Sequence, residues 1–291
     1  MTEDTIRKLI REEIRANNDI LEEKIKHHQN LLPFATYMGE DTVLTKSYFY
    51  TMYLVSAHDT IVAPYLIRYG VYETELTKYL LNAIRPDSVF VDVGANIGYY
   101  TCMASKKISA GQVFAFEPNE KAFRLLQRNI MLNWPDCPVK AEQVAISDKK
   151  DEVAFKNYKY KFVTSQFFTS EEEGEMNSYE VVKVPTISLD EYFPQGQKID
   201  FLKIDVEGAE LGVLKGAKRV IETNPGMQIL MEWSVPQLKT QGTDPHDIID
   251  FFMERGYTPS QLDWRDGSAS EVNYDHLRQT EYMCAVLLQK K

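Results

Sequence analysis

Two acidic residues, each at the end of a short apolar run, have the chemistry to bind a nucleotide-type cofactor. Asp92 lies at the end of the run Val89–Val93 and precedes a turn bracketed by Gly94 and Gly98. Glycines there permit positive φ and a close approach of the backbone to a ligand. Glu117 ends the next apolar run, where a carboxylate can accept hydrogen bonds from both hydroxyls of a ribose. The pattern predicts a cofactor loop.

The spacing of the glycines favours one cofactor over another. A dinucleotide site uses G-x-G-x-x-G, whose middle glycine lets a pyrophosphate approach a helix N-terminus. Here Ala95 and Asn96 occupy the gap in a D-x-G-x-x-x-G pattern. Asp92 would repel a phosphate but suits the ammonium of an amino acid. The sequence therefore favours S-adenosylmethionine, although Glu117 alone is also compatible with NAD. An NAD-dependent oxidoreductase or a non-catalytic cofactor-binding protein is the alternative from another functional class.

The elements that must position these residues alternate between strand and helix. Apolar runs typical of buried strands are followed by segments with helical periodicity. Such alternation predicts an α/β protein with a doubly wound, mostly parallel sheet and a ligand cleft at the carboxyl ends of the strands. The strands are expected at 89–93, 112–116, 139–146, 199–204, 227–232, 257–262 and 283–288, and helices at 97–108, 119–133, 209–222 and 245–256. Five carboxylates fall at that rim: Asp92, Glu117, Asp205, Glu207 and Glu232.

Three blocks of this chain resemble a known family. They read VDVGANIGYYT, FAFEPNEKAFRLLQRNIMLN and LKIDVEGAELGVLKGA, and they occur in the order typical of the FkbM-type methyltransferases, a branch of the class I S-adenosylmethionine-dependent enzymes. The shorter pieces VAISD, VPTISLDEYF and ILMEW fit as well. The resemblance covers roughly residues 59–233. It implies a Rossmann-like fold whose last strand is antiparallel, together with an N-terminal helical and β extension.

The resemblance also implies which residues hold the cofactor. Class I methyltransferases place adenine at the end of the third strand, here Ala145 to Ser147, and the family has a glycine-aromatic-glutamate element that Tyr72 and Glu73 match. The cofactor-binding residues expected on this basis are Glu73, Asp92, Gly94, Ala95, Asn96, Gly98, Tyr100, Thr101, Glu117, Pro118, Ala145, Ile146, Ser147 and Asp205.

Transfer of a methyl group to a hydroxyl requires alignment and a group that takes the proton. The candidates for catalysis are Asp205 and Glu207, with Lys203 orienting them. A Mg²⁺ site is the alternative, because hard cations prefer oxygen ligands and Asp205 could combine with Glu207 or Glu232. His58 is a further candidate base only if the N-terminal segment folds over the cleft.

The resemblance implies that the acceptor is a hydroxyl on a glycan, glycolipid or secondary metabolite. An N-methyltransferase would often carry an Asn/Asp-Pro-Pro-Tyr element after the fourth strand, whereas this chain has Asp205-Val-Glu-Gly. O-methylation is therefore preferred, with methylation of a carboxylate or of nitrogen as the alternatives. The partner is a small-molecule or glycan acceptor.

The composition of the chain indicates which partners and which cellular compartment to expect. The formal net charge of −10 argues against nucleic-acid binding, which needs cations to displace counterions from phosphates. The three cysteines, Cys102, Cys137 and Cys284, are too few and too far apart for a disulfide framework. No apolar run reaches the roughly 20 residues of a membrane span and no signal peptide is recognisable. We expect a cytoplasmic protein without a transmembrane segment.

The chain divides into three predicted parts. Residues 1–32 form an amphipathic helix whose apolar stripe could pack on its own domain, support a homodimer or lie on a membrane. The family resemblance implies that residues 33–84 form a segment that covers the cofactor cleft. Residues 85–291 form the S-adenosylmethionine-binding domain, with an antiparallel insertion at 148–184.

Overall fold

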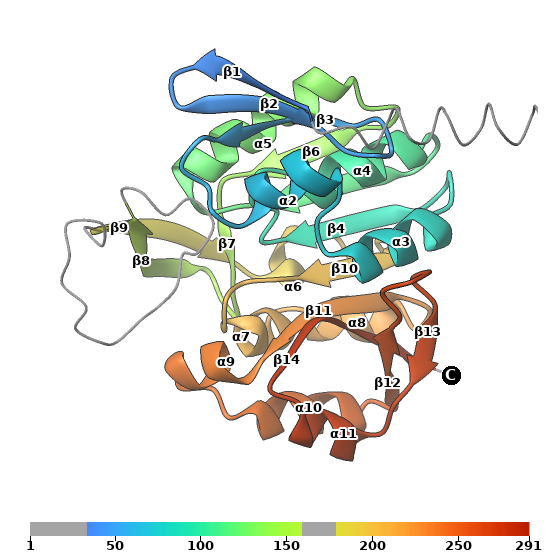
Figure 1. The fold of residues 1–291 in the computed structure, drawn as a ribbon. Coiled ribbons are helices and arrows are strands. Elements are labelled where there is room, and N and C mark those ends of the chain that lie inside the picture. Colours follow the sequence, from blue (N-terminus) through green and yellow to red (C-terminus); the bar gives the residue numbers. More distant parts are fainter. Residues whose placement is uncertain (1–33, 159–178, 291) are drawn as a thin grey trace, which may run out of the picture.

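The computed structural model describes residues 34–158 and 179–290 of the chain. The predicted helix at 1–32, and with it the basis for a homodimer, lies outside the described residues, as does the middle of the insertion at 148–184. Within the described ranges, the chain folds around one eight-stranded sheet with helices on both faces (Figure 1).

The central sheet has the order β13-β12-β14-β11-β10-β4-β5-β6. Its five consecutive parallel strands are β6 (Val139–Glu142), β5 (Gln112–Phe116), β4 (Val89–Val93), β10 (Phe201–Ile204) and β11 (Gln228–Ser234). β14 (Tyr282–Lys290) is antiparallel to both β11 and β12 (Tyr257–Leu262), and the short β13 (Ala269–Glu271) closes that edge. The expected doubly wound sheet with a late antiparallel strand is confirmed.

Alternation along the parallel strands divides the apolar residues between two cores. Val91 and Val93 of β4 and Leu202 of β10 pack into the core on one face, whereas Phe90 and Phe201 pack into the core on the other. The first core is covered by α6 (Leu189–Tyr192), α7 (Glu210–Lys215), α8 (Lys218–Thr223), α9 (Val235–Thr240), α10 (Pro245–Met253) and α11 (Tyr274–Gln279). The second is covered by α2 (Val62–Tyr69), α3 (Thr74–Ala83), α4 (Tyr99–Lys107) and part of α5 (Glu120–Asn133).

A separate antiparallel sheet precedes the cofactor domain. It consists of β1 (Ala35–Gly39), β2 (Thr42–Lys46) and β3 (Met52–Ser56). α5 binds the free edge of β3: the Asn129 side chain accepts from Leu54 N–H at 2.7 Å and donates to Leu54 C=O at 3.0 Å, and Asn133 bonds Met52 in the same way. Residues 34–84 therefore share a core and hydrogen bonds with the cofactor domain.

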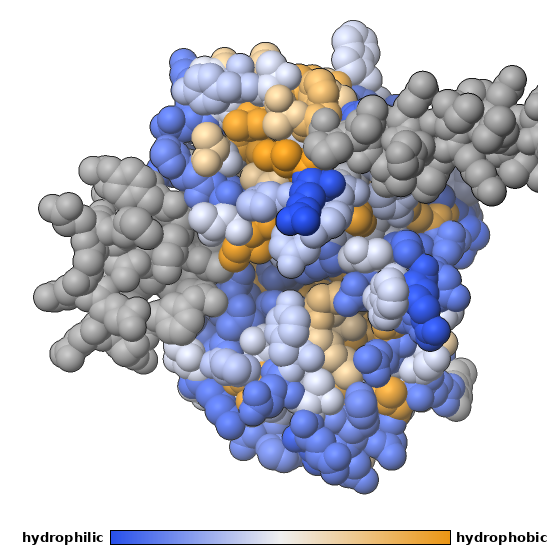
Figure 2. Space-filling view, viewed as in Figure 1, coloured by the Kyte–Doolittle hydropathy of each residue, from blue (hydrophilic) through white to orange (hydrophobic). Residues whose placement is uncertain are grey.

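Apolar side chains remain exposed on that small sheet. Tyr37 and Met38 of β1 are 64% and 54% exposed. Figure 2 shows orange, apolar residues gathered over this end of the molecule, while polar residues cover most of the C-terminal end of the same face.

Two element boundaries differ from the sequence expectation. The predicted third strand, 139–146, is split: β6 ends at Glu142, and β7 (Ala145–Ile146) instead pairs with β9 (Tyr179–Ile187), which pairs antiparallel with β8 (Asp151–Tyr158). The predicted helix at 209–222 is also split, between α7 and α8. There the backbone of Gly216 lies so close to the Ser147 carbonyl that a Cβ would be 2.0 Å from its oxygen.

Candidate functional site

The order of the strands reverses between β4 and β10, and a cavity of about 360 Å³ opens at the carboxyl ends of the strands there. Ligands of doubly wound sheets bind at such a switch point. Of the predicted cofactor residues, eleven line the cavity: Glu73, Gly94, Ala95, Asn96, Tyr100, Glu117, Pro118, Ala145, Ile146, Ser147 and Asp205. Glu207, Glu232 and Lys203 line it as well.

The glycine turn after β4 brings backbone close to backbone. Gly94 has φ +79°, and a Cβ on it would lie 1.8 Å from the Asp205 carbonyl oxygen, so no other residue fits. The N–H groups of Gly94 and Ala95 both donate to Phe116 C=O at 3.0 Å. This turn therefore ties the ends of three neighbouring strands together at the floor of the cavity.

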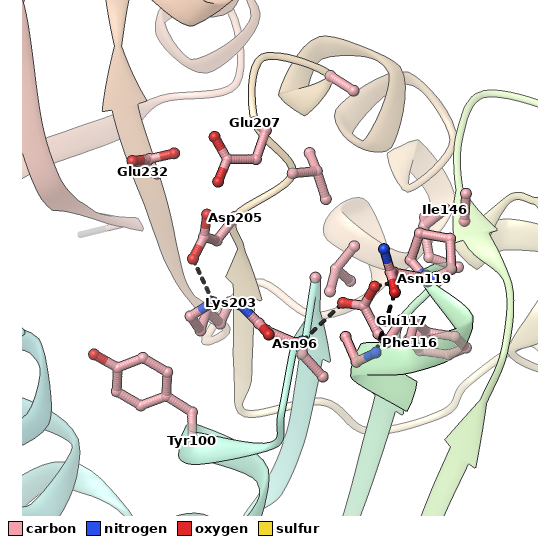
Figure 3. Close-up of a pocket in the computed structure, with 18 of the residues that line it drawn as sticks. Asn96, Tyr100, Phe116, Glu117, Asn119, Ile146, Lys203, Asp205, Glu207 and Glu232 are labelled. Atoms are coloured by element: carbon pink, nitrogen blue, oxygen red, sulfur yellow. Dashed lines mark hydrogen bonds and ion pairs between the residues drawn. The ribbon is translucent and has the colours of Figure 1, made fainter. Parts of the chain in front are cut away.

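Glu117 lies on the opposite side of the cavity from Asp205, Glu207 and Glu232 (Figure 3). Its Oε2 accepts from Asn96 N–H at 2.8 Å and its Oε1 from Asn119 N–H at 2.7 Å. Burial raises the pKa of Glu117 to about 7, although these two backbone N–H groups oppose the rise. The carboxyl group is thus fixed in orientation while each oxygen keeps a lone pair for a ligand hydroxyl.

Asp92, Gly98 and Thr101 lie behind the cavity wall rather than on it. Asp92 is completely buried, and its Oδ2 accepts from Thr101 Oγ1 at 2.7 Å. Strand alternation explains the difference from the prediction, because Asp92 and Phe90 point toward the α4 side, whereas Val93 ends the strand. Asp92 therefore supports the site from below and does not face a ligand ammonium in this structure.

Lys203 connects the buried layer to the cavity. Its Nζ lies 3.1 Å from Asp205 Oδ2, 3.7 Å from Asp92 Oδ1 and 5.2 Å from the centre of the Tyr100 ring. Burial alone lowers the pKa of this lysine, but Asp205, Asp92 and Glu73 outweigh burial and hold it above its usual value. Lys203 is thus a permanent cation, consistent with the predicted orienting role.

Glu73 enters the cavity from the segment before the cofactor domain. It has φ +44°, at the N-cap of α3, and its Oε2 accepts from Tyr100 Oη at 2.6 Å. Burial and the charge of Asp205 raise the pKa of Glu73 to about 7. Tyr72 lines the cavity beside it, with its ring edge-on to Tyr99.

A second group of acidic side chains faces Asp205 (Figure 3). Burial, followed by the charge of Asp205, raises the pKa of Glu207 to about 8 and that of Glu232 to about 11. Glu207 accepts a hydrogen bond from Gln237 Nε2. Gly208, with φ +101°, packs directly on α9, since a Cβ there would be 2.5 Å from Gln237 C=O. Glu207 and Glu232 therefore share one side of the cavity.

The geometry gives no support to the predicted Mg²⁺ site. Within residues 34–158 and 179–290, no group of three or more His, Cys, Asp or Glu side chains is arranged to hold a metal ion. His58 is not among the residues that line the cavity; its Nε2 lies 3.4 Å from Asp41 Oδ2.

The cavity also includes residues that the sequence analysis did not single out. Asn119 caps α5, and an Asn before a helical pattern is a signal that could have pointed to it. Val62, Thr186 and Gln241 come from α2, β9 and the end of α9. No local pattern marks these three, because only the packing of distant segments brings them here.

A doubly wound sheet in which the antiparallel β14 lies between β11 and β12, with a glycine turn and a ribose-type carboxylate at its switch point, is the architecture of the class I S-adenosylmethionine-dependent methyltransferases. The chain belongs to the FkbM methyltransferase family, whose domain matches residues 92–259. The resemblance noted in the sequence is thereby confirmed, and the cofactor is S-adenosylmethionine rather than NAD.

Relatives carry methyltransferase names. The chain is 29% identical over 191 residues to the hexuronic acid methyltransferase AglP of Haloferax volcanii, covering 62% of this chain and 68% of that protein. It is 31% identical over 153 residues to the methyltransferase sdnD of Sordaria araneosa, covering 43% of this chain and 59% of that protein. Among solved structures, TYW2 of P. horikoshii has a TM-score of 0.44 at 12% identity, covering 91% of this chain and 80% of that one.

In the described part of the chain, no helix has the length and apolar character needed to cross a bilayer.

Proposed function

We propose that this methyltransferase transfers a methyl group to a hydroxyl of a glycan, glycolipid or secondary metabolite. The observation that carries the proposal is the charge of the cavity. Glu73, Asp205, Glu207 and Glu232 line it, and Lys203 is the only basic side chain among the described lining residues. The Lys203 ammonium already contacts two carboxylates. A neutral hydroxyl enters such a cavity without a charge penalty.

The alternatives fit the cavity less well. A carboxylate acceptor would add a negative charge where burial and mutual repulsion already raise the pKa values of Glu73, Glu207 and Glu232. An amine would be held by the same carboxylates in its protonated form, which is not a nucleophile. Both arguments favour O-methylation over ester formation and over N-methylation.

The residues on the β5 side fit the cofactor. Glu117 presents two oriented oxygens for ribose hydroxyls, and Asn96 Oδ1 is buried without a hydrogen-bond partner among the described residues, as expected where a ligand supplies one. When bound, S-adenosylmethionine supplies an electrophilic methyl group. The chain's own residues then have to align the acceptor and take its proton.

Glu207 is the residue we assign to that proton transfer. A general base works best with a pKa near the working pH, and the pKa of about 8 at Glu207 meets this condition better than the value of about 11 at Glu232. Gln237 donates to Glu207 and holds its carboxyl group, and Lys203 holds Asp205 beside it. Glu207 thus accepts the hydroxyl proton as the new C–O bond forms.

The type of acceptor is supported by one relative. The Haloferax volcanii protein is named for a hexuronic acid, a sugar that carries both hydroxyls and a carboxylate. We infer a sugar-type acceptor for this chain but a different reacting group, because the described residues that line the cavity offer no free cation for a carboxylate.

The test uses S-adenosylmethionine with a deuterated methyl group and three sets of methyl glycosides: neutral hexosides, hexuronosides and aminohexosides. Products are treated with mild alkali, which cleaves methyl esters and leaves methyl ethers, and are analysed by mass spectrometry. We expect an alkali-stable product from the neutral set. Products confined to alkali-labile esters or to N-methyl amines would contradict the proposal.

A pair of variants tests the base. Glu207→Gln should lower kcat by about 100-fold or more, the usual worth of a general base, with binding of S-adenosylhomocysteine kept. Glu254→Gln is the matched control, since Glu254 is 74% exposed at the end of α10. In the wild type, kcat/KM should rise with pH through about 8 and level off above it, as Glu207 loses its proton.

A further inference from the structure

Two polar side-chain atoms on the acceptor side of the cavity lack partners. Glu232 Oε2 and Gln241 Nε2 are both buried, and neither has a hydrogen-bond partner within the described ranges. Both residues line the cavity. A buried polar group left unpaired costs roughly 1 to 3 kcal/mol, and folded proteins keep few of them. Two of them on one wall of a binding cavity indicate that the ligand supplies their partners.

The two residues belong to one continuous segment, formed by β11 and the helix α9 that follows it. Glu232 lies near the end of β11, and Gln241 is the C-cap of α9, which follows directly. Gln241 also packs on Gly208, next to Glu207: a Cβ on that glycine would lie 2.7 Å from Gln241 Cγ. The amide and the two carboxyl groups therefore belong to one wall, part of which is visible in Figure 3.

The chemistry of that wall suits neighbouring hydroxyl groups. Gln241 Nε2 can only donate, and a pKa of about 11, raised by burial and by Asp205, keeps Glu232 protonated at neutral pH, so it can donate and accept. A hydroxyl also does both. An apolar ring with a single hydroxyl would use the reacting position and leave Glu232 and Gln241 unpaired.

Two tyrosines flank these residues, Tyr72 in the lining of the cavity and Tyr282 on the strand beside Glu232. Tyr72 lines the cavity, and its ring is packed edge-on against Tyr99 and Tyr65, at centroid distances of 6.0 and 6.2 Å. Tyr282 begins β14, opposite Ser234 and thus two residues beyond Glu232 on the neighbouring strand, and it is 57% exposed. Tyrosine combines an apolar ring face with a hydroxyl that can hydrogen-bond.

We propose that Glu232, Gln241, Tyr72 and Tyr282 form a subsite for a neutral pyranose ring, with the two polar groups on its hydroxyls and the tyrosines on its C–H faces. The subsite narrows the class of acceptor in the proposed function. Its role in methyl transfer rests on that function, whereas its binding of sugars does not. It selects glycans and glycolipids over apolar metabolites, and neutral sugars over hexuronates.

The test measures binding apart from chemistry. The protein is saturated with S-adenosylhomocysteine, and binding of the methyl glycosides of glucose, galactose and mannose, of methyl glucuronoside and of cyclohexanol is measured by saturation-transfer NMR. We expect at least one neutral hexoside to bind more tightly than both the uronoside and cyclohexanol. Gln241→Leu should weaken that binding about tenfold or more, because a site built to hydrogen-bond a hydroxyl loses its partner. Gln261→Leu, at an exposed position of β12, is the matched control.

A second pair of variants tests the subsite independently, in case Gln241→Leu fails to fold. Tyr282 is exposed, so Tyr282→Ala is expected to fold and to lose hexoside binding, whereas Tyr282→Phe keeps it. Equal binding of cyclohexanol and hexoside, tighter binding of the uronoside, or hexoside binding unchanged in both Gln241→Leu and Tyr282→Ala would overturn the subsite. Failure to bind S-adenosylhomocysteine would instead count against the proposed function, and hexoside binding without methyl transfer would leave the subsite standing and remove the O-methylation.

Discussion

Lys203 and Asp92 lie directly opposite each other across the β10–β4 pair, with Lys203 Nζ 3.7 Å from Asp92 Oδ1. Asp92 is completely buried and Lys203 is 3% exposed. The pair therefore places a lysine and an aspartate opposite each other at the floor of the cavity. Asp205 Oδ2 lies 3.1 Å from the same ammonium, and Asp205 lines the cavity, so the lysine links the buried Asp92 to a carboxylate that faces the site.

Removing the cation should be strongly destabilising. Lys203→Met leaves Asp92 buried and without its counter-charge, and the loss of one partner of a buried pair costs about 3 to 5 kcal/mol. Urea unfolding measures the change. Lys198→Met is the control, because its pair with Asp200 is 58% exposed on the lysine side and is worth about 1 kcal/mol at most. Equal losses in the two variants would argue against a stabilising role for Lys203.

The carboxyl group of Glu117 should matter for cofactor affinity. In Glu117→Gln, an amide nitrogen faces one of the two backbone N–H groups that now donate to Glu117, so the side chain must turn or lose a bond. We expect calorimetry to show S-adenosylhomocysteine binding weakened about tenfold or more, equivalent to about 1.4 kcal/mol. Glu120→Gln, which changes only an exposed pair with Arg124, should bind normally. Normal binding by both variants would remove Glu117 from the cofactor site.

Substitutions at Gly94 and Gly196 distinguish the cost of backbone strain from the cost of steric overlap. Gly94→Ala and Gly196→Ala both place a Cβ at φ near +80°, but only Gly94 has a backbone atom in the way, the Asp205 carbonyl oxygen. The strain alone costs about 1 to 2 kcal/mol, so Gly196→Ala should lose that much. Gly94→Ala should lose more than about 4 kcal/mol, the range of severe mutations, as measured by thermal or urea unfolding. Similar losses at the two sites would show that the loop after β10 moves away freely.

Stability should fall as the pH rises from about 5 to 8. Burial and Asp205 raise the pKa of Glu207 to about 8 in the folded chain, above its ordinary value, so the folded state holds a proton that the unfolded state has released. The contribution is fully present below the unfolded pKa and is lost as the pH rises through the folded one. Burial raises the pKa values of Glu73, Glu117, Glu210 and Glu232 as well, so Glu207→Gln should make this part of the profile of unfolding temperature against pH less steep without removing the slope, and Glu254→Gln should leave the slope unchanged. A wild-type profile that rises over this range would contradict the assignment.

The sequence predicts the parallel part of the sheet well because its signals are local. Val89 to Val93 is a buried, β-branched run, and the glycine turn that follows it is recognisable from spacing alone. The depth of Asp92 was not predictable in the same way. Side chains alternate between the two faces of a strand, so whether Asp92 faces the ligand or a helix depends on which residue ends the strand. Its pairing with Lys203 depends on the register between β4 and β10, which only the folded sheet defines.

The residues on the acceptor side of the cavity were predicted only in part, because local sequence signals mark some of them and not others. Asp205, Glu207 and Glu232 follow or end predicted strands, so they could be placed at the rim. Gln241 could not, because it reaches the cavity only through the packing of α9 on Gly208. The break between α7 and α8 likewise depends on contact with Ser147, far away in the chain.

The amides of Asn129 and Asn133 have a consequence for association between molecules. The edge of a sheet exposes N–H and C=O groups that can recruit a strand from another chain. At Met52 and Leu54 these groups are already bonded to side chains of α5. A foreign strand could pair there only after α5 had moved, and α5 begins three residues after Glu117. Growth of the sheet at this edge therefore requires the bonds from Asn129 and Asn133 to break first, so the edge of β3 is protected against strand addition while α5 stays in place.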